Sequence, residues 1–400
     1  MKYRLLSSIY YEDLLEYENT YKKRYESESS YRYSFSIASN KAFLVINNNI
    51  LNLITDILKL DKMLTLKINY LPNIALKQYS KKCIIDEIKM TNDIEGVIST
   101  RKEITEILED FSGKKKGTIL YGLVKKYELL TQEDIDLNNC NDIRYIFDEL
   151  VLNEVSAEDS QNIPDGEIFR KDSVYIQNKT GKTIHTGINP ESKIIETLTN
   201  CLDMLKNENY NKLVSIAVFH YMFGYIHPFY DGNGRVSRFI SSYLLSKELN
   251  PLISYKLSHT IKKNLDAYYK SFRIVNDEKN KGELTSFVEY FLGVLLDSLK
   301  DSMEYLNEKI NRLNYFEKQL DSLYASQNID TRELDILYIL IQNTLFGEHS
   351  ISVNELFDVT DLGLSKIRTS LKTLESLGFV NSMKNGKRLV YEANLENLEK

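Results

Sequence analysis

The stretch that decides the fold is H-P-F-Y-D-G-N-G-R-V-S-R, residues 227–238. Apolar residues before it predict a helix that Pro228 ends, because proline disfavours helical geometry in the residue that precedes it. The Asp231–Gly234 segment predicts a turn. From Arg235 onwards, apolar residues recur at helical spacing. The sequence therefore predicts a glycine-rich turn at the start of a helix.

This turn carries residue types that suit phosphate chemistry. Backbone N–H groups at a helix N-terminus form a cradle for anions, and glycines let a phosphate approach the backbone closely. Arg235 and Arg238 lie three residues apart, on nearly one face of the helix, and can add bidentate phosphate contacts. Asp231 offers a hard carboxylate for Mg²⁺, and His227 can accept a proton near neutral pH. Taken singly, each is more often an ordinary turn or capping residue.

Jointly, residues 227–238 resemble the signature of the Fic family, H-P-F-x-D-G-N-G-R-x-x-R, at every fixed position. Residues 219–226 are similar to the helix that leads into this motif, and the resemblance covers roughly residues 35–300. It implies a mainly α fold, in which a Fic-type helical core carries a small β-hairpin flap. The C-terminal pattern described below adds a winged-helix domain.

Fic enzymes move AMP from ATP to a hydroxyl side chain of a target protein, and the resemblance assigns roles to single residues. His227 would take the proton from the attacking hydroxyl. Asp231 would hold a Mg²⁺ ion that bridges the α- and β-phosphates, and Phe229 would anchor the loop in the core. ATP is therefore the expected substrate and Mg²⁺ the expected cofactor.

The other motif residues are implied to bind the nucleotide. Asn233 and the backbone from Gly232 to Arg235 would cradle the phosphates. Arg235 and Arg238 would bind the β- and γ-phosphates. Gly234 favours AMP transfer, because family members that transfer phosphate tend to carry lysine at this position.

Residues 173–187 predict a β-hairpin ahead of the motif. Two short β-like runs, Ser173–Gln177 and Thr183–Thr186, flank a turn at Asn178–Lys182. The segment resembles the family's flap, which would dock a target protein by pairing with it as an added strand. The alternative is a plain surface hairpin.

Downstream, residues 257–269 are similar to the helix that closes the adenosine pocket of the family. Asn264 and Tyr268 match the family pattern and are candidate nucleotide contacts. Thr260 stands where tyrosine is common, and Leu265 stands where arginine is common. The alternative is that this helix simply packs an apolar face against the core.

The segment T-N-D-I-E-G, residues 91–96, resembles the inhibitory motif (S/T)xxxE(G/N) of self-restrained Fic proteins. Thr91 and Glu95 share a helix face, and Gly96 would end the helix. In the family this glutamate pairs with the second arginine of the motif, here Arg238, which then cannot clamp a phosphate. In some relatives the same glutamate positions a water that removes AMP from the target. The alternative is a capping threonine and a solvated glutamate.

Residues 331–400 resemble a winged helix-turn-helix domain. The predicted elements are helices at Glu333–Gln342, Val353–Phe357 and Leu364–Leu377, then strands at Phe379–Lys384 and Arg388–Ala393 around an Asn385–Lys387 turn. The 364–388 segment has a local charge of +5, from six basic residues minus one acidic residue. The six are Lys366, Arg368, Lys372, Lys384, Lys387 and Arg388, against Glu375. This face suits DNA phosphates; the alternative is a protein-binding module.

Length and composition predict several domains in a mainly helical protein. The chain has 400 residues and only five prolines. We expect an N-terminal helical region with the inhibitory helix at 1–110, a Fic core at 111–303, a connecting helix at 304–330 and the winged helix at 331–400. A net charge of −6 argues against a protein whose main task is to coat nucleic acid.

The sequence predicts a cytoplasmic protein with no membrane segment. Glu12 and Asp13 interrupt the N-terminus before any long apolar run, and Ser286–Leu299 is too short to span a bilayer. Relatives often form homodimers, which makes a second copy of the chain a candidate partner.

Three functions fit these patterns. The first is an autoinhibited protein adenylyltransferase. The second is a DNA-binding transcriptional regulator whose Fic domain senses nucleotide, although sensing alone would not need His227 as a base. The third is an enzyme that removes AMP from proteins with the help of Glu95.

Overall fold

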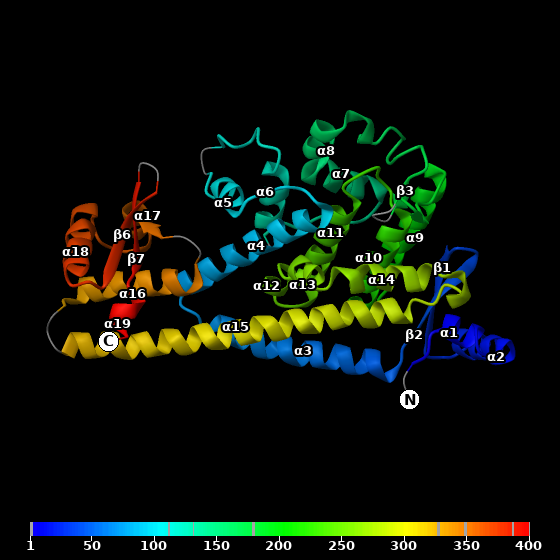
Figure 1. Cartoon of the computed structure of the whole chain (residues 1–400), viewed down its shortest axis with the longest axis horizontal. Helices are drawn as coiled ribbons and strands as arrows, with labels where there is room; N and C mark the ends of the chain where they lie inside the picture. Colours follow the sequence, from blue (N-terminus) through cyan, green and yellow to red (C-terminus); the bar gives the residue numbers. More distant parts are fainter. Residues whose placement is uncertain are drawn as a thin grey trace. The chain divides into compact units, whose positions relative to one another are not determined.

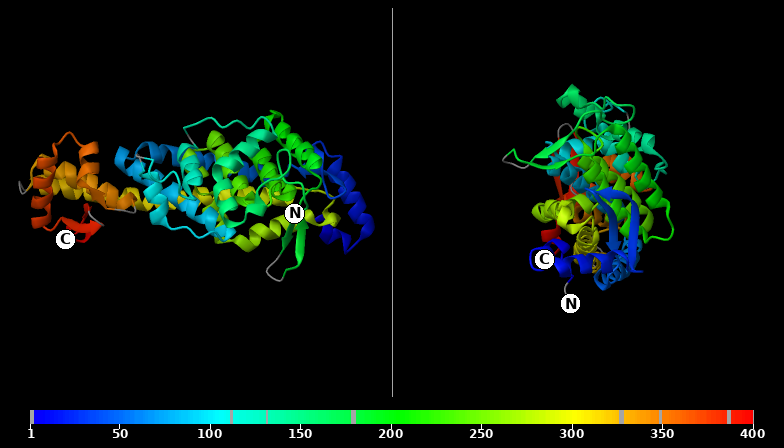
Figure 2. Two further views of the ribbon diagram at one scale, coloured as in Figure 1. Left: turned by 90° about the horizontal axis from the view of Figure 1, so that it is seen from above. Right: turned by 90° about the vertical axis from the view of Figure 1, so that its right-hand side faces the viewer.

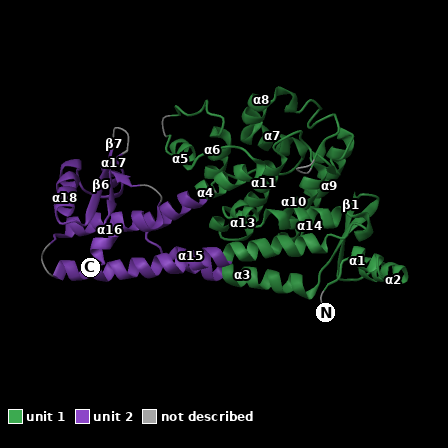
Figure 3. Ribbon diagram, in the orientation of Figure 1, with its two compact units in different colours: residues 1–61, 84–299 green, residues 62–83, 300–400 purple. Residues whose placement is uncertain are grey.

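The computed structural model describes residues 3–110, 113–130, 132–177, 181–325, 329–347, 350–385 and 388–399. It is mainly helical, with a few small sheets, as the sequence predicts (Figure 1). The chain forms two compact units, coloured separately in Figure 3. Unit 1 contains residues 1–61 and 84–299, and unit 2 contains residues 62–83 and 300–400.

The division between the units falls inside helices α3 (Asn48–Asn69), α4 (Asn73–Glu95) and α15 (Thr285–Ala325). The other helices of unit 1 are α1 (Leu6–Tyr10), α2 (Leu14–Tyr25), α5 (Arg101–Leu108), α6 (Tyr121–Leu129), α7 (Cys140–Leu150), α8 (Leu152–Glu158), α9 (Glu191–Lys206), α10 (Lys212–Ile226), α11 (Asn233–Glu248), α12 (Pro251–Ser254), α13 (Leu257–Lys263) and α14 (Leu265–Asn276). Short 3-10 turns lie at Ser160–Asn162 and Glu278–Asn280.

Helix α10 is the centre of unit 1. Residues 213–223 are all buried, which is the pattern of a helix that is covered on every side. Its nearest helical neighbours are α9 before it and α11 after it. The candidate active-site loop therefore leaves the C-terminal end of the most deeply buried helix of the unit.

His220 joins α10 to α11 and α14 through two hydrogen bonds. Its Nδ1 lies 2.8 Å from Ser241 Oγ, and its Nε2 lies 2.9 Å from the Tyr268 hydroxyl. Because Ser241 Oγ donates its own proton to the Ser237 carbonyl at 2.8 Å, Nδ1–H must be the donor to Ser241, and Nε2 accepts from Tyr268. Burial lowers the pKa of His220 to about 3, so the ring is neutral at pH 7.

An N-terminal hairpin corrects the expectation that residues 1–110 are helical. Strands β1 (Ser30–Ile37) and β2 (Asn40–Val45) pair antiparallel, with Ser30 opposite Val45. Tyr33, Phe35 and Ile37 are buried at every second position of β1. This two-residue alternation is the ordinary signal of a half-buried strand, and it outweighed the helical composition of the region.

The second hairpin lies where the sequence predicts the flap. Strands β3 (Tyr175–Gln177) and β4 (Thr183–Thr186) pair antiparallel, with Tyr175 opposite Thr186. Residues 178–180 of the predicted turn lie outside the described residues. Figure 2 shows this hairpin projecting from the helices of unit 1.

The C-terminal part of unit 2 has the three predicted helices and the two predicted strands in the predicted order. It consists of α16 (Thr331–Phe346), β5 (Ile351–Ser352), α17 (Val353–Val359), α18 (Leu364–Ser376), β6 (Val380–Asn385), β7 (Arg388–Ala393) and α19 (Leu395–Leu398). Strand β5 and helix α19 were not predicted. The sheet has the strand order β5-β7-β6. Ile367, Leu371 and Leu374 of α18 are buried, while residues 386 and 387 of the predicted turn lie outside the described residues. That this is a winged helix stays a prediction.

Helix α15 replaces the separate connecting helix that the sequence predicts at 304–330. It runs without interruption from Thr285 to Ala325, so the predicted boundary at residue 303 falls inside one helix. Among the described residues, no helix combines the length and apolar character that crossing a membrane requires.

We predict that acid destabilises this fold through His220. The unfolded histidine titrates near pH 6.5 and the folded one near pH 3, so the unfolded chain binds more protons between these values. The free energy of unfolding therefore falls as the pH drops, by about 3 kcal/mol from this residue between pH 6.5 and pH 4. Urea unfolding at a series of pH values measures the loss.

The matched control for this test is His220→Gln. Glutamine keeps one donor and one acceptor for Ser241 and Tyr268 but does not titrate. We expect the variant to be less stable at pH 7 and to show a shallower pH dependence. Equal slopes for the two proteins would show that His220 does not cause the acid sensitivity.

Candidate active site

Residues 227–232 form a tight loop between α10 and α11. Helix α10 ends at Ile226, and His227 adopts a left-handed conformation with φ 53°. Gly232 repeats that conformation with φ 78°, immediately before α11 begins at Asn233. A left-handed histidine is strained, so the surrounding structure must hold it in place.

Asn233 and Phe229 fix the shape of this loop. The Asn233 side chain accepts from the Phe229 N–H at 2.9 Å and donates to the Phe229 carbonyl at 2.8 Å. The Phe229 ring is fully buried, stacked on Phe147 with a centroid distance of 3.9 Å. Phe229 thus lies in the core, as predicted. Both groups of the Asn233 amide are engaged within the loop, and its phosphate contact stays a prediction.

A hydrogen bond and burial fix the protonation state of His227. Its Nδ1 lies 3.3 Å from the Gly224 carbonyl. Because a carbonyl only accepts, Nδ1 carries the proton and Nε2 keeps a free lone pair. The side chain is partly exposed, and the burial of the ring lowers the pKa of His227 to about 4. The imidazole is therefore neutral at pH 7 and able to take a proton.

Asp231 lies at the edge of a cleft of about 940 Å³ beside the loop. The cleft is also lined by Glu95, Glu154 and Arg235. Asp231 Oδ1 accepts from the Gly232 N–H, and the side chain stays partly exposed. The carboxylate is therefore accessible next to one of the motif arginines.

Arg238 is held by Thr91 and Glu95, two of the three residues of the predicted inhibitory motif. Its Nε donates to Thr91 Oγ1 at 2.8 Å, and its Nη2 donates to the Thr91 carbonyl at 3.1 Å. Nη2 also forms an ion pair with Glu95 Oε1 at 2.7 Å. The Arg238 side chain is almost completely buried, whereas the Glu95 side chain is 28% exposed. One edge of the guanidinium fork is therefore occupied by α4.

The end of α4 places Glu95 at this position. The helix ends at Glu95, and Gly96 follows with φ 79°. The Val97 N–H then donates to the Asn92 carbonyl at 3.0 Å, which is the hydrogen bond of a Schellman cap. A Cβ atom added to Gly234 would lie 2.1 Å from Glu95 Oε1. Glycine at 234 is thus required for Glu95 to approach the motif this closely.

Arg235 has a partner that the sequence analysis did not predict. Its Nη1 forms an ion pair with Glu154 Oε1 of α8, and both side chains are buried. Burial raises the pKa of Glu154, and the charge of Arg235 opposes this shift. Glu154 and Arg235 are 81 residues apart in the chain, so no spacing pattern links them. Both motif arginines therefore carry a carboxylate partner.

The predicted helix over residues 257–269 is wrong, because the structure has two helices there. Helix α13 ends at Lys263 and α14 begins at Leu265. Asn264 lies between them and caps α14 by accepting from the Ala267 N–H at 3.3 Å. The cap interrupts the helix because its backbone is not helical, and the Asn264 side chain is exposed.

The two predicted nucleotide contacts of this segment have different surroundings. Tyr268 is buried and bonded to His220 in the core, while Asn264 is exposed and caps α14. The motif residues and the 91–96 segment, in contrast, are brought into direct contact around Arg238.

Comparison with known proteins finds similarity to the Fic/DOC family. Residues 139–245 match the model of the Fic/DOC family. The chain is 26% identical over 223 residues to "Protein adenylyltransferase Fic" of Aedes aegypti, covering 54% of this chain and 41% of that protein. It is also 26% identical over 221 residues to the protein of the same name from Culex quinquefasciatus, with the same coverage. The chain thus spans about two fifths of the length of these relatives.

Among solved structures, a Fic family protein from Desulfovibrio desulfuricans G20 is similar with a TM-score of 0.52 and 20% identity. The match covers 88% of this chain and 97% of that one, and it shows the fold. The part of the chain that matches the Fic/DOC family model, residues 139–245, contains the loop and the arginines described above.

Proposed function

We propose that this protein transfers AMP from ATP to a hydroxyl side chain of a target protein, and that Glu95 restrains the reaction. The proposal is carried by one arrangement: a neutral His227 with a free Nε2, followed by a glycine turn at the N-terminus of α11. The name of the mosquito relatives, protein adenylyltransferase, favours the same reaction.

In this reaction, the backbone N–H groups at the start of α11 and the cations of Arg235 and Arg238 would bind the phosphates. The target oxygen attacks the α-phosphorus, and its proton passes to Nε2 of His227. The bond from the α-phosphorus to the oxygen of the β-phosphate breaks, and pyrophosphate leaves. Positioning and charge neutralisation supply most of the acceleration, because the protein forms no covalent intermediate.

Mg²⁺ fits this site through Asp231. A magnesium ion usually takes one or two carboxylates and completes its shell with phosphate oxygens and water. Asp231 is a partly exposed carboxylate at the cleft and lies four residues after His227. A bound ion would neutralise charge on the phosphates.

The flap is the proposed docking site for the target protein. Among the strands that the structure describes, β3 and β4 pair only with each other, so each keeps an unpaired edge. An extended target segment can add to such an edge through backbone hydrogen bonds, with little demand on its sequence. This would place a target hydroxyl near the loop that carries His227.

We predict that Glu95→Gly raises AMP transfer by at least about tenfold, because removing one charge-assisted hydrogen bond of roughly 1.5–3 kcal/mol frees Arg238 for phosphate. His227→Ala in the same background should lower transfer by about 10²-fold or more. The measurement is the transfer of label from ATP labelled on the α-phosphate to protein, with Mg²⁺ and a cell lysate.

The matched control is Glu158→Gly. Glu158 lines the same cleft and is also the last residue of its helix, but it makes no ion pair with a motif arginine among the described residues. This variant should behave like the wild type. If no variant transfers label from the α-phosphate of ATP to protein, AMP transfer is contradicted. If labelled protein loses its label instead, AMP removal is favoured.

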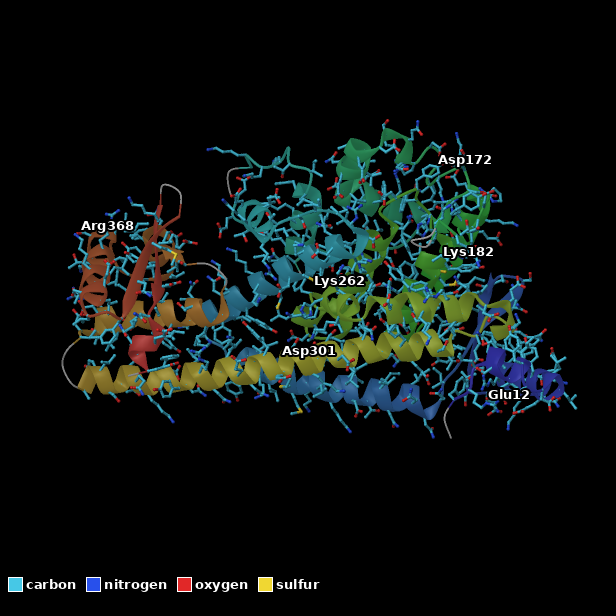
Figure 4. The ribbon with its side chains drawn as sticks, in the orientation of Figure 1. Glu12, Asp172, Lys182, Lys262, Asp301 and Arg368 are labelled. Atoms are coloured by element: carbon cyan, nitrogen blue, oxygen red, sulfur yellow. The ribbon has the colours of Figure 1, made fainter. Side chains whose placement is uncertain are left out.

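We propose a second function, DNA binding, for the C-terminal part of unit 2. Three basic residues of α18, Lys366, Arg368 and Lys372, are exposed, and Arg368 is labelled in Figure 4. Lys384 of β6 is exposed as well. A helix with such a face can contact phosphates along a DNA groove.

We predict that the double variant Lys366→Glu and Arg368→Glu weakens binding to duplex DNA. Each lost phosphate contact should reduce the slope of log affinity against log salt by about 1. Fluorescence anisotropy with labelled duplex at several salt concentrations measures this. The control is Lys22→Glu with Lys23→Glu, which reverses two exposed charges on α2. Equal weakening by both pairs, or no binding by the wild type, would contradict a specific role of α18.

A further inference from the structure

Arg170 is a fully buried arginine that lies between the flap and the active-site loop. Its Nη1 donates to the Asp172 carbonyl at 2.6 Å, and its Nη2 donates to the Ile188 carbonyl at 2.8 Å. Its Nε donates to the His227 carbonyl at 2.9 Å. Nη2 also reaches the Ile226 carbonyl at 3.4 Å. One side chain therefore bonds to three separate segments of the chain.

The partners of Arg170 are all backbone carbonyls. Among the described residues, no carboxylate forms an ion pair with it. Burying a guanidinium is costly unless its N–H groups are bonded and its charge is compensated, and carbonyl dipoles compensate less than a carboxylate does. A lysine ammonium is more strongly hydrated and lacks the planar fork, and an apolar residue would leave these carbonyls without a donor. The arrangement therefore indicates a role that depends on the planar fork of the arginine.

The three segments are the two ends of the flap and the candidate base. Asp172, labelled in Figure 4, precedes β3, and Ile188 follows β4. His227 is the strained left-handed residue, and its carbonyl is oriented by Arg170. The Arg170 backbone N–H also donates to the Pro228 carbonyl at 3.3 Å. A change in the spacing of the flap ends would therefore be transmitted to the histidine.

Gly187 shows how closely these parts approach. A Cβ atom added there would lie 2.5 Å from Arg170 Nη2, 2.8 Å from Val174 Cγ1 and 3.1 Å from His227 Cβ. The Gly187 N–H donates to the Val174 carbonyl at 3.0 Å, which closes the base of the hairpin. The base of the flap thus packs directly against His227.

Two further side chains, Tyr230 and His185, make contacts around the flap and the active-site loop. The Tyr230 hydroxyl accepts from the Asp172 N–H at 3.0 Å and lies 2.9 Å from Asp165 Oδ1. His185 of β4 places its Nε2 2.6 Å from the Tyr225 carbonyl, at the end of α10. Arg170 is the only one of these three side chains that bonds to both ends of the flap and to His227 among the described residues.

We infer that Arg170 is a positioning residue that couples the flap to His227, so that a target segment docked on the flap fixes the base in its reactive orientation. The inference rests on the proposed function for what docks and what is transferred. The coupling itself is a property of the folded chain, and it can be measured without substrate.

The test compares Arg170→Gln and Arg170→Lys with the wild type by amide hydrogen exchange. Gln removes the charge and most of the fork, while Lys keeps the charge but cannot bond to three carbonyls at fixed angles. We expect exchange of the Gly187 and Ile188 amides to rise by about tenfold or more in both variants, because each loses at least one hydrogen bond at the base of the flap.

The second readout is the pKa of His227, measured by NMR of labelled histidines and assigned with His227→Ala. The ionisable groups that act on this ring are Arg170, His185 and Glu95. Removing the Arg170 cation, whose charge lowers the pKa of His227, should raise that pKa in Arg170→Gln. In Arg170→Lys, which keeps the cation, the pKa should stay closer to that of the wild type. A purely structural defect would not separate the two variants in this way.

The control is Arg32→Gln, which removes an arginine that also bonds to two backbone carbonyls, those of Tyr25 and Ser27, far from the flap in sequence. Unchanged flap exchange and an unchanged His227 pKa in folded Arg170→Gln would overturn the inference. If Arg170→Gln does not fold, the test rests on Arg170→Lys. Unchanged amide hydrogen exchange at the base of the flap in that variant would also overturn the inference. A third outcome separates the two proposals. If amide exchange in the flap and the pKa of His227 both change in Arg170→Gln, but Glu95→Gly transfers no label from ATP labelled on the α-phosphate, the coupling is supported and the transferase function is contradicted.

Discussion

A buried guanidinium group must keep its N–H groups bonded and its charge compensated. The motif at residues 227–238 depends on three such groups. Arg170, Arg235 and Arg238 are among the largest fully buried side chains of the chain. Each meets the requirement differently: Arg170 with backbone carbonyls, Arg235 with Glu154, and Arg238 with Thr91 and Glu95. The geometry of the loop follows from where these partners lie.

The kind of partner decides which of the arginines can serve a ligand. A phosphate can replace a carboxylate in front of a guanidinium, because both present paired anionic oxygens. It cannot replace the carbonyls that hold Arg170, since these belong to the chain that forms the site. Arg170 is thus a permanent part of the scaffold, whereas Arg235 and Arg238 are the arginines that the proposed nucleotide substrate could contact. Arg170 is therefore suited to a positioning role, and Arg235 and Arg238 are suited to binding a ligand.

The sequence predicted those parts of the site that depend on neighbouring residues. The glycine turn, the end of α10 before Pro228 and the end of α4 at Gly96 all follow from local backbone preferences. The pairing of Glu95 with Arg238 joins distant segments, and it was predictable only from the resemblance of residues 91–96 to a known motif.

The parts that were not predicted depend on tertiary contacts or on signals that compete. Glu154 and Arg170 look like ordinary surface residues in the sequence, and only the fold buries them beside the loop. In β1, buried and exposed residues alternate, which is typical of a strand. The surrounding sequence has a helical composition, and for this reason a helix was predicted there. The break at Asn264 depended on a capping preference that competed with an apolar helical pattern.

The two carboxylates that face the motif arginines differ in how easily they can be displaced. Glu95 is 28% exposed, so it can turn towards water when a phosphate takes its place, and the cost of separating the pair is moderated by solvation. Glu154 is 9% exposed, and separating it from Arg235 would leave a charge unpaired in the core. Such a step costs roughly 3–5 kcal/mol in buried pairs. If the protein binds a nucleotide as we propose, the nucleotide should displace Glu95 first, while Glu154 keeps Arg235 in place. Control of the proposed reaction would then lie at the end of α4.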